Sequence, residues 1–74
     1  MTLATLNNGE RGKVVALKGD NAVSKRLMEM GIVPGVSLRV IKSAPFGDPL
    51  EIRVLGYNLA VRKSEASQIE ITKD

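Results

Sequence analysis

The chain contains no cysteine and no histidine. Without cysteine it can form no disulfide bond, and it offers no thiolate as a nucleophile or a metal ligand. Without histidine it lacks the commonest general base and the commonest transition-metal ligand. The carboxylates are scattered, with none at the spacing of a calcium-binding loop. The sequence therefore predicts no catalytic residue, no cofactor and no tight metal site.

Two serine–lysine neighbours come nearest to a catalytic pair, Ser24 with Lys25 and Ser64 with Lys63. Adjacent residues on a helix or a strand point in different directions, so neither lysine can act as the base for its serine. We therefore expect a binding protein rather than an enzyme.

Aromatic residues are also scarce, with one Phe, one Tyr and no Trp. Proteins that bind single-stranded nucleic acid usually present aromatic side chains on which bases stack. The 11 Lys and Arg residues outnumber the 8 Asp and Glu residues, for a net charge of +3, but they are spread along the chain. No nucleic-acid partner is expected.

Long apolar runs are missing too. No segment approaches the roughly 18 apolar residues of a membrane-spanning helix, and no charged-then-apolar leader opens the chain. We expect no membrane insertion and a cytoplasmic location. The 74 residues suffice for one small domain, 1–74, of marginal stability.

One segment, 22–30, has apolar residues at helical spacing: Val23, Leu27 and Met30. This spacing predicts a short α-helix with these side chains on its buried face. Asp20 or Asn21 is expected to cap the first turn. Gly31 suits the left-handed residue that ends a helix.

Five other segments are rich in β-branched residues or alternate apolar with polar residues: 13–18, 36–43, 50–54, 59–62 and the segment around Ile69 and Ile71. Adjacent Val14 and Val15 indicate a bulge in the first strand. Residues 56–58 are expected to form a turn, and Ser64 to cap a single helical turn. The sequence predicts a mainly β fold, a small, partly open β-barrel of about five strands with one short α-helix.

The inward positions of these segments predict a single hydrophobic core. Its expected members are Leu27, Val36, Leu38, Val40, Ile52, Val54, Leu59, Val61 and Ile69.

The loop 44–49 is the first candidate site. Its two prolines fix φ near about −65° and pre-shape the backbone, so an aromatic residue presented there loses little entropy on binding. Phe46 either anchors a partner or folds down to cover the end of the barrel. The candidate partner-binding residues of this loop are Pro45, Phe46, Gly47, Asp48 and Pro49.

Polar residues on the outer face of the helix, Arg26 and Glu29, are expected to support the loop in binding. Three apolar residues off the predicted core are secondary candidates: Met28, Leu55 and Tyr57. Single exposed apolar residues are common in proteins, so these three indicate a site only if they join Phe46 in one patch.

The motifs resemble those of a known family, ferrous iron transport protein A (FeoA). The similar segments are Leu3, Leu6, Gly9 and Gly12, the run 26–35, the loop 44–49 and the segment 59–66. The run 26–35 is similar to the family's Arg-Leu…Gly…Pro-Gly core, and the loop is similar to its Ala-Pro-x-Gly-Asp-Pro motif. Val61 stands where the family more usually has Leu.

The resemblance implies an SH3-like barrel. It also implies a small cytoplasmic accessory protein of bacterial ferrous iron uptake, which binds and modulates FeoB, a membrane Fe(II) transporter with a cytosolic GTP-binding region. The family is sometimes labelled as transition-metal-ion binding, a label that a chain without His or Cys does not itself support. The alternative interpretation is a free-standing SH3-like regulatory or nucleic-acid-binding module, related to the C-terminal domain of metal-dependent repressors.

Overall fold

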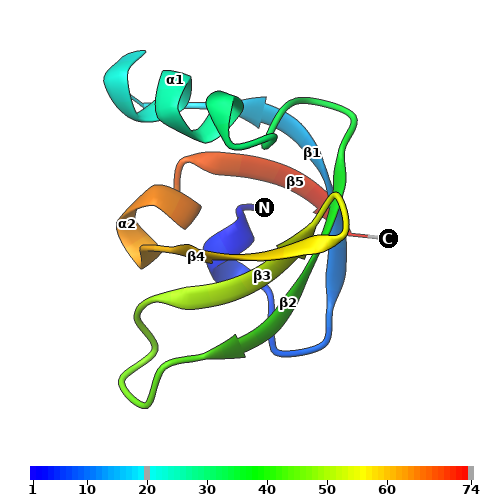
Figure 1. Cartoon of the computed structure of the whole chain (residues 1–74), viewed down its shortest axis with the longest axis vertical. Helices are drawn as coiled ribbons and strands as arrows, with labels where there is room; N and C mark the ends of the chain where they lie inside the picture. Colours follow the sequence, from blue (N-terminus) through cyan, green and yellow to red (C-terminus); the bar gives the residue numbers. More distant parts are fainter. Residues whose placement is uncertain (20, 74) are drawn as a thin grey trace.

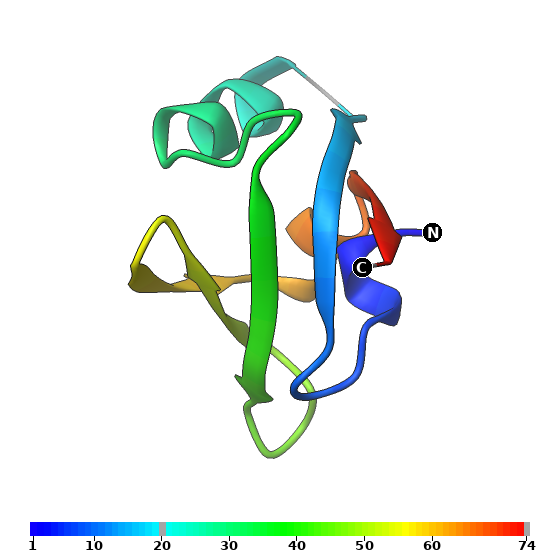
Figure 2. The same ribbon diagram turned by 90° about the vertical axis from the view of Figure 1, so that its right-hand side faces the viewer.

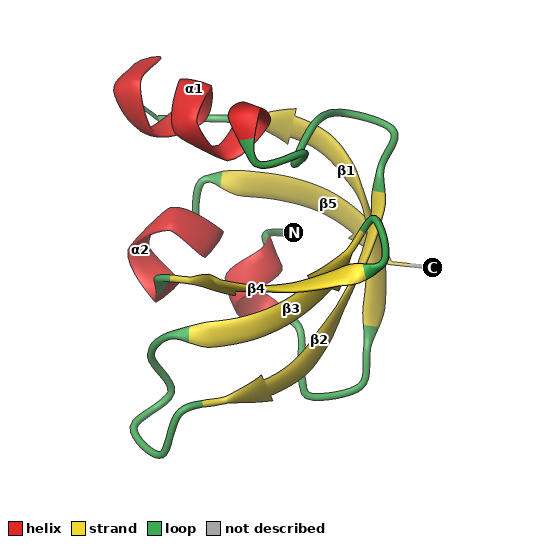
Figure 3. Ribbon diagram, viewed as in Figure 1, coloured by secondary structure: helices red, strands yellow, loops and turns green. Residues whose placement is uncertain are grey.

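The computed structural model describes residues 1–19 and 21–73 of the chain. In these ranges the strands are β1 (Arg11–Leu17), β2 (Ser37–Ser43), β3 (Leu50–Val54), β4 (Tyr57–Val61) and β5 (Ile69–Lys73) (Figures 1 and 3). The helices are η1 (Leu3–Thr5, a 3₁₀ turn), α1 (Asn21–Glu29) and α2 (Lys63–Ala66). None of these helices combines the length and the apolar character needed to cross a bilayer.

All strand pairs are antiparallel, in the sheet order β4-β3-β2-β1-β5. The sheet curls around the core, with α1 at one end and α2 bridging β4 to β5 (Figures 1 and 2). The two edge strands, β4 and β5, do not pair with each other among the described residues. The sheet is therefore not closed, which confirms the predicted partly open β-barrel.

The predicted bulge in β1 is confirmed by a register shift between Val14 and Ala16 against β5. The extra residue, Val15, is 48% exposed, while Val14 lies in the core. A second shift in β2, between Val40 and Lys42, was not apparent from the alternation. Bulges bend a strand and increase its twist, so both help the sheet to curl.

Helix α1 ends as the sequence predicts. Gly31 adopts φ +94°, and the N–H of Ile32 donates to the carbonyl of Leu27 at 3.0 Å. This pattern satisfies carbonyl groups left open at a helix C-terminus and turns Ile32 back into the core. The expected caps at the other end, Asp20 and the side chain of Asn21, lie outside the described residues.

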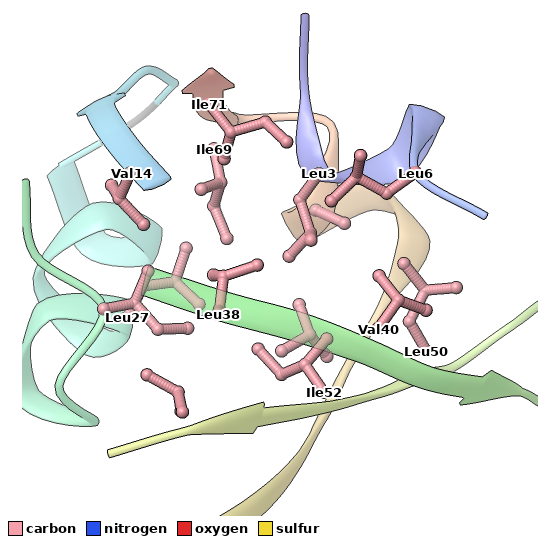
Figure 4. Packing of buried hydrophobic residues seen from close by; sticks show 14 residues of the cluster. Leu3, Leu6, Val14, Leu27, Leu38, Val40, Leu50, Ile52, Ile69 and Ile71 are labelled. Carbon is pink, nitrogen blue, oxygen red and sulfur yellow. The ribbon is translucent and has the colours of Figure 1, made fainter. Parts of the chain in front are cut away.

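One hydrophobic cluster fills the barrel (Figure 4). Seven of the predicted core residues are buried: Leu27, Leu38, Val40, Ile52, Val54, Val61 and Ile69. The other two, Val36 and Leu59, are partly buried against the cluster. The core also includes Leu3 and Leu6 from around η1, which the sequence patterns did not predict.

The predicted turn at 56–58 is wrong. The turn consists of Leu55 and Gly56, with φ values of 52° and 83°, and Tyr57 already pairs with Val54 in the ladder. Two-residue hairpins with positive φ at both positions match the twist of the flanking strands. The turn is shorter than expected because Leu55 adopts a left-handed conformation that leucine seldom adopts.

The predicted cap at Ser64 is also wrong, because α2 begins at Lys63 with Arg62 as its N-cap. The Glu65 side chain reaches back and accepts the N–H of Arg62 at 3.0 Å. This is the carboxylate half of a capping box, which satisfies a backbone donor without a hydroxyl at the cap position.

Candidate partner-binding site

The loop between β2 and β3 is closed by its own backbone. The N–H of Gly47 donates to the carbonyl of Ala44 at 2.7 Å, and the N–H of Ala44 donates to the carbonyl of Pro49 at 3.0 Å. Gly47 lies at φ +83°, which a side chain would disfavour. The turn residues therefore set the shape of the loop tip.

A hydrogen bond to a residue outside the loop also holds the loop in place. Asp48 Oδ1 accepts the N–H of Lys63, the first residue of α2, at 2.9 Å. The following Asp48–Pro49 peptide bond is cis. The hydrogen bond between Lys63 and Asp48 therefore attaches the loop to the barrel at a second point, in addition to the two strands that the loop joins.

Phe46, at the tip of this loop, is 98% exposed. Its ring does not fold down to cover the end of the barrel. Of the two roles expected for Phe46, covering the barrel end is therefore excluded. The fold gains almost no burial from its ring, whereas burying a phenylalanine in a partner would remove on the order of 150–250 Å² of surface from water. Phe46 is therefore free to bind.

Two adjoining grooves connect the loop to α1. One, of about 330 Å³, is lined by Arg26, Met30, Pro49, Ala60, Arg62 and Glu65. The other, of about 230 Å³, is lined by Lys42, Ser43, Ala44, Pro45, Pro49, Glu51 and Ala60. Because they share Pro49 and Ala60, the structure brings both loop prolines and Arg26 to one continuous surface.

Arg26 has a structural partner that the sequence did not reveal. Its guanidinium forms an ion pair with Glu65 Oε2, which has no other donor among the described residues. Glu65 is buried, at 7% exposure, and its second oxygen accepts the N–H of Arg62. Glu29, the other helix residue predicted for the site, is exposed. Arg26 therefore lines the groove as an anchored charge.

The secondary candidates Leu55 and Tyr57 do not join Phe46. The Tyr57 hydroxyl donates to the carbonyl of Met30, and Leu55 Cδ1 would be 2.7 Å from a Cβ placed on Gly31. Both hold the β3–β4 hairpin against the end of α1. They lie at the far end of the 5-residue strand β3 from the loop, about 17 Å away along the strand.

Leu55 and Tyr57 remain 66% and 42% exposed, and Met28, on α1, is 44% exposed. All three are accessible apolar side chains, and Leu55 and Tyr57 lie at the opposite end of β3 from Phe46. Within the described residues, no three acidic side chains come together in a group that could hold a metal ion.

The additional residues of the site are Lys63 and Glu65, which fix the loop and Arg26. Lys63 contributes a backbone N–H, which carries no sequence signal. A glutamate three residues after a cap is a known helix-start signal. Here it was obscured, because Arg62 occupies the position where Ser or Thr is usual.

The chain matches a protein family, a curated relative and solved structures whose names include FeoA or Fe(2+) transport protein A. Residues 1–73 match the FeoA domain family. A fusion of Fe(2+) transport protein A with the Fe(2+) transporter FeoB, from Porphyromonas gingivalis, is 35% identical over 71 residues. These cover 96% of this chain but only 8% of that protein.

Two solved structures are closely similar. The FeoA protein of Chlorobium tepidum superimposes with a TM-score of 0.92 at 38% identity, over 99% of this chain and 70% of that one. A zinc complex of Stenotrophomonas maltophilia FeoA, described as an SH3 domain protein, gives 0.85 at 30% identity, over 97% and 89% of the two chains. A family match over nearly the whole chain, together with these relatives, shows that the chain belongs to the FeoA domain family.

Proposed function

We propose that this chain is an accessory protein of bacterial ferrous iron uptake, which binds the cytosolic, GTP-binding region of a FeoB-type transporter on the cytoplasmic side of the membrane. The observation that carries the proposal is Phe46, 98% exposed on a loop held by its own backbone and by Lys63. The fusion of the two proteins in Porphyromonas gingivalis supports the partner.

The chain acts by binding and not by catalysis. Phe46 enters a pocket of the transporter, and the grooves along Pro45, Pro49 and Arg26 receive the rim of that pocket. An aromatic anchor in a desolvated pocket typically carries about 2 kcal/mol or more of binding free energy, and charges at the rim carry less. Docking on the GTP-binding region changes its rate of GTP hydrolysis.

Calorimetric titration of the transporter's cytosolic region with this chain tests the proposal. Phe46→Ala is expected to raise the Kd roughly thirtyfold, the equivalent of about 2 kcal/mol, and to leave the melting temperature unchanged. Val15→Ala, at another exposed apolar position, serves as the matched control and should leave both quantities unchanged. The rate of GTP hydrolysis is measured with and without the chain.

Full affinity in Phe46→Ala would show that the loop is not the docking site. Loss of affinity in Leu55→Ala instead would move the site to the β3–β4 hairpin. No binding by the unaltered chain at micromolar concentrations would reject the partner itself.

A further inference from the structure

Three arginines stand in a row across the outer face of the sheet. Arg11 on β1 is directly opposite Arg39 on β2, and Arg39 is directly opposite Arg53 on β3. All three side chains are exposed, and β1 and β2 lie side by side on the face turned toward the viewer in Figure 2. We call these residues the arginine row; at the usual strand spacing it spans about 10 Å.

The row is not neutralised within the described residues. The side chains of Arg11 and Arg39 make no hydrogen bond or ion pair there, and the described ion pairs are Met1–Glu70, Arg26–Glu65 and Lys73–Glu10. Arg53 donates to two uncharged oxygens, Asn58 Oδ1 and the Gly56 carbonyl, each at 3.2 Å. Like charges directly opposite each other destabilise a sheet, so a bound anion would relieve repulsion that the fold leaves in place.

A groove of about 330 Å³ runs along the row. It is lined by Arg11, Ser37, Leu38, Arg39, Arg53, Leu55 and Gly56. Every arginine of the row contributes to it, and Leu55, 66% exposed, provides an accessible apolar side chain. Guanidinium groups bind carboxylates through paired hydrogen bonds. No aromatic side chain lines the groove, so it offers nothing on which a base could stack.

We infer that the arginine row is a protein-binding surface that receives an acidic segment of a partner, with carboxylates on the arginines and an apolar side chain against Leu55. Charge complementarity commits it to an anionic occupant. The exposed leucine and the lack of aromatic residues favour a polypeptide over a nucleic acid. The surface is formed by residues other than those of loop 45–49, so the inference stands independently of the proposed function.

The test uses a fluorescein-labelled peptide of one leucine followed by five glutamates, with a peptide of one leucine and five glutamines as its uncharged counterpart. Fluorescence anisotropy is measured at low salt and at about 0.15 M salt, where exposed charges are screened beyond about 8 Å. The unaltered chain is expected to bind the glutamate peptide, more weakly as salt rises, and not the glutamine peptide.

Arg39→Gln, at the centre of the row, is expected to weaken that binding about tenfold. Lys25→Gln removes the same charge from an exposed position on α1 and should change it less than about twofold. Arg39→Glu places an acid between two arginines. It should abolish binding while raising the melting temperature by about 4 to 8 °C, because each cross-strand pair changes from repulsion to attraction.

Several results would overturn the inference. Equal losses in Arg39→Gln and Lys25→Gln would mean that only net charge matters. A lower melting temperature for Arg39→Glu would mean that the row is not under repulsion. Tighter, Arg39-dependent binding of single-stranded RNA or of phosphatidylserine vesicles would assign the surface to those ligands, and absence of binding to the glutamate peptide would reject it outright.

Discussion

The Arg26 guanidinium on α1 forms an ion pair with Glu65 on α2. Three strands, β2, β3 and β4, lie between these two helices in the sequence. Glu65 is the buried charged side chain of the described structure, and its carboxylate also caps the helix in which it lies. The pair therefore connects the helix at the end of the barrel to the turn that leads into β5. A residue predicted to serve a partner thus also stabilises the fold.

The first prediction concerns this ion pair. Arg26→Ala should lower the free energy of unfolding by about 1–3 kcal/mol, because a buried carboxylate oxygen loses its partner. The arginine itself is 59% exposed, so solvent replaces part of the interaction and the larger losses of fully buried pairs are not expected. Urea denaturation measures the difference. Lys25→Ala, one residue earlier and exposed, is the control, and an equal effect in both variants would contradict the prediction.

The second prediction concerns how firmly α1 is packed on the barrel. Leu27 is fully buried at 0% exposure, and truncating it to alanine should lower stability by about 2–5 kcal/mol. Met28→Ala, on the exposed side of the same helix, should change it by less than about 0.5 kcal/mol. Thermal and urea unfolding of both variants test this, and an unchanged melting curve for Leu27→Ala would show that the helix contributes little to the core.

The third prediction is a stabilising substitution at the β3–β4 turn. Leu55 lies at φ 52° before Gly56, and Asn-Gly is a favoured pair for a turn of this kind. Leu55→Asn should therefore stabilise the chain by about 0.5–1 kcal/mol, net of lost contacts around Gly31. Leu55→Val should destabilise it, because a β-branched residue tolerates positive φ still less. Equal stability of the two variants would show that the turn is not strained.

The fourth prediction concerns pH. A hydrogen bond with Lys73 and a second with the N–H of Asn7 hold the pKa of Glu10 below its ordinary value of 4.5. A carboxylate with a lowered pKa in the folded state stabilises that state fully above its ordinary pKa, and the gain is lost as the pH falls through the folded-state value. Glu10→Gln should therefore lower the melting temperature at neutral pH but not in strong acid.

Melting curves recorded from neutral pH down to below the ordinary pKa of Glu10 provide the measurement. Glu29→Gln, an exposed position on α1, is the control and should show a much smaller difference at neutral pH. A Glu10→Gln difference that persists unchanged into strong acid would mean that the lost contact is not ionic.

The fifth prediction is that the isolated chain binds Fe(II) weakly or not at all. It has no His or Cys, and the described carboxylates form no group of three, so the nitrogen and sulfur ligands that favour transition metals are missing. Calorimetry with Fe(II), and with Zn(II) because a relative was solved with zinc, tests this. Saturable binding at micromolar or lower Kd would contradict it. Repeating the titration across protein concentrations separates a site in one chain from a site shared between chains.

Much of the fold was predictable because local chemistry and tertiary structure agree. Gly31 ends α1 where a left-handed residue was expected, and the adjacent Val14 and Val15 mark a real bulge. The sequence patterns failed where tertiary contacts, and not local periodicity, determine which side chains are buried. Leu3 and Leu6 show no strand or helix periodicity, yet they are buried, because η1 packs against α2 and β5.

The candidate site was predictable only in part. Its loop could be identified from two prolines around the single Phe, but a loop has no alternation from which to tell whether Phe46 points in or out. The structure shows that it points out. The arginine row was not predicted from the sequence, because Arg11, Arg39 and Arg53 come together only through the register of three strands.

The hydrogen bond between the Tyr57 hydroxyl and the Met30 carbonyl has a practical consequence. This chain has no Trp, so Tyr57, its only tyrosine, dominates the near-ultraviolet absorbance and the intrinsic fluorescence. The fluorescence of its ring therefore reports on one contact, the packing of the β3–β4 hairpin against the end of α1. Detachment of α1 should change the emission as the hydroxyl exchanges a protein acceptor for water. The protein thus carries its own optical reporter, and its titration with a partner that contains neither tryptophan nor tyrosine can be followed without a label.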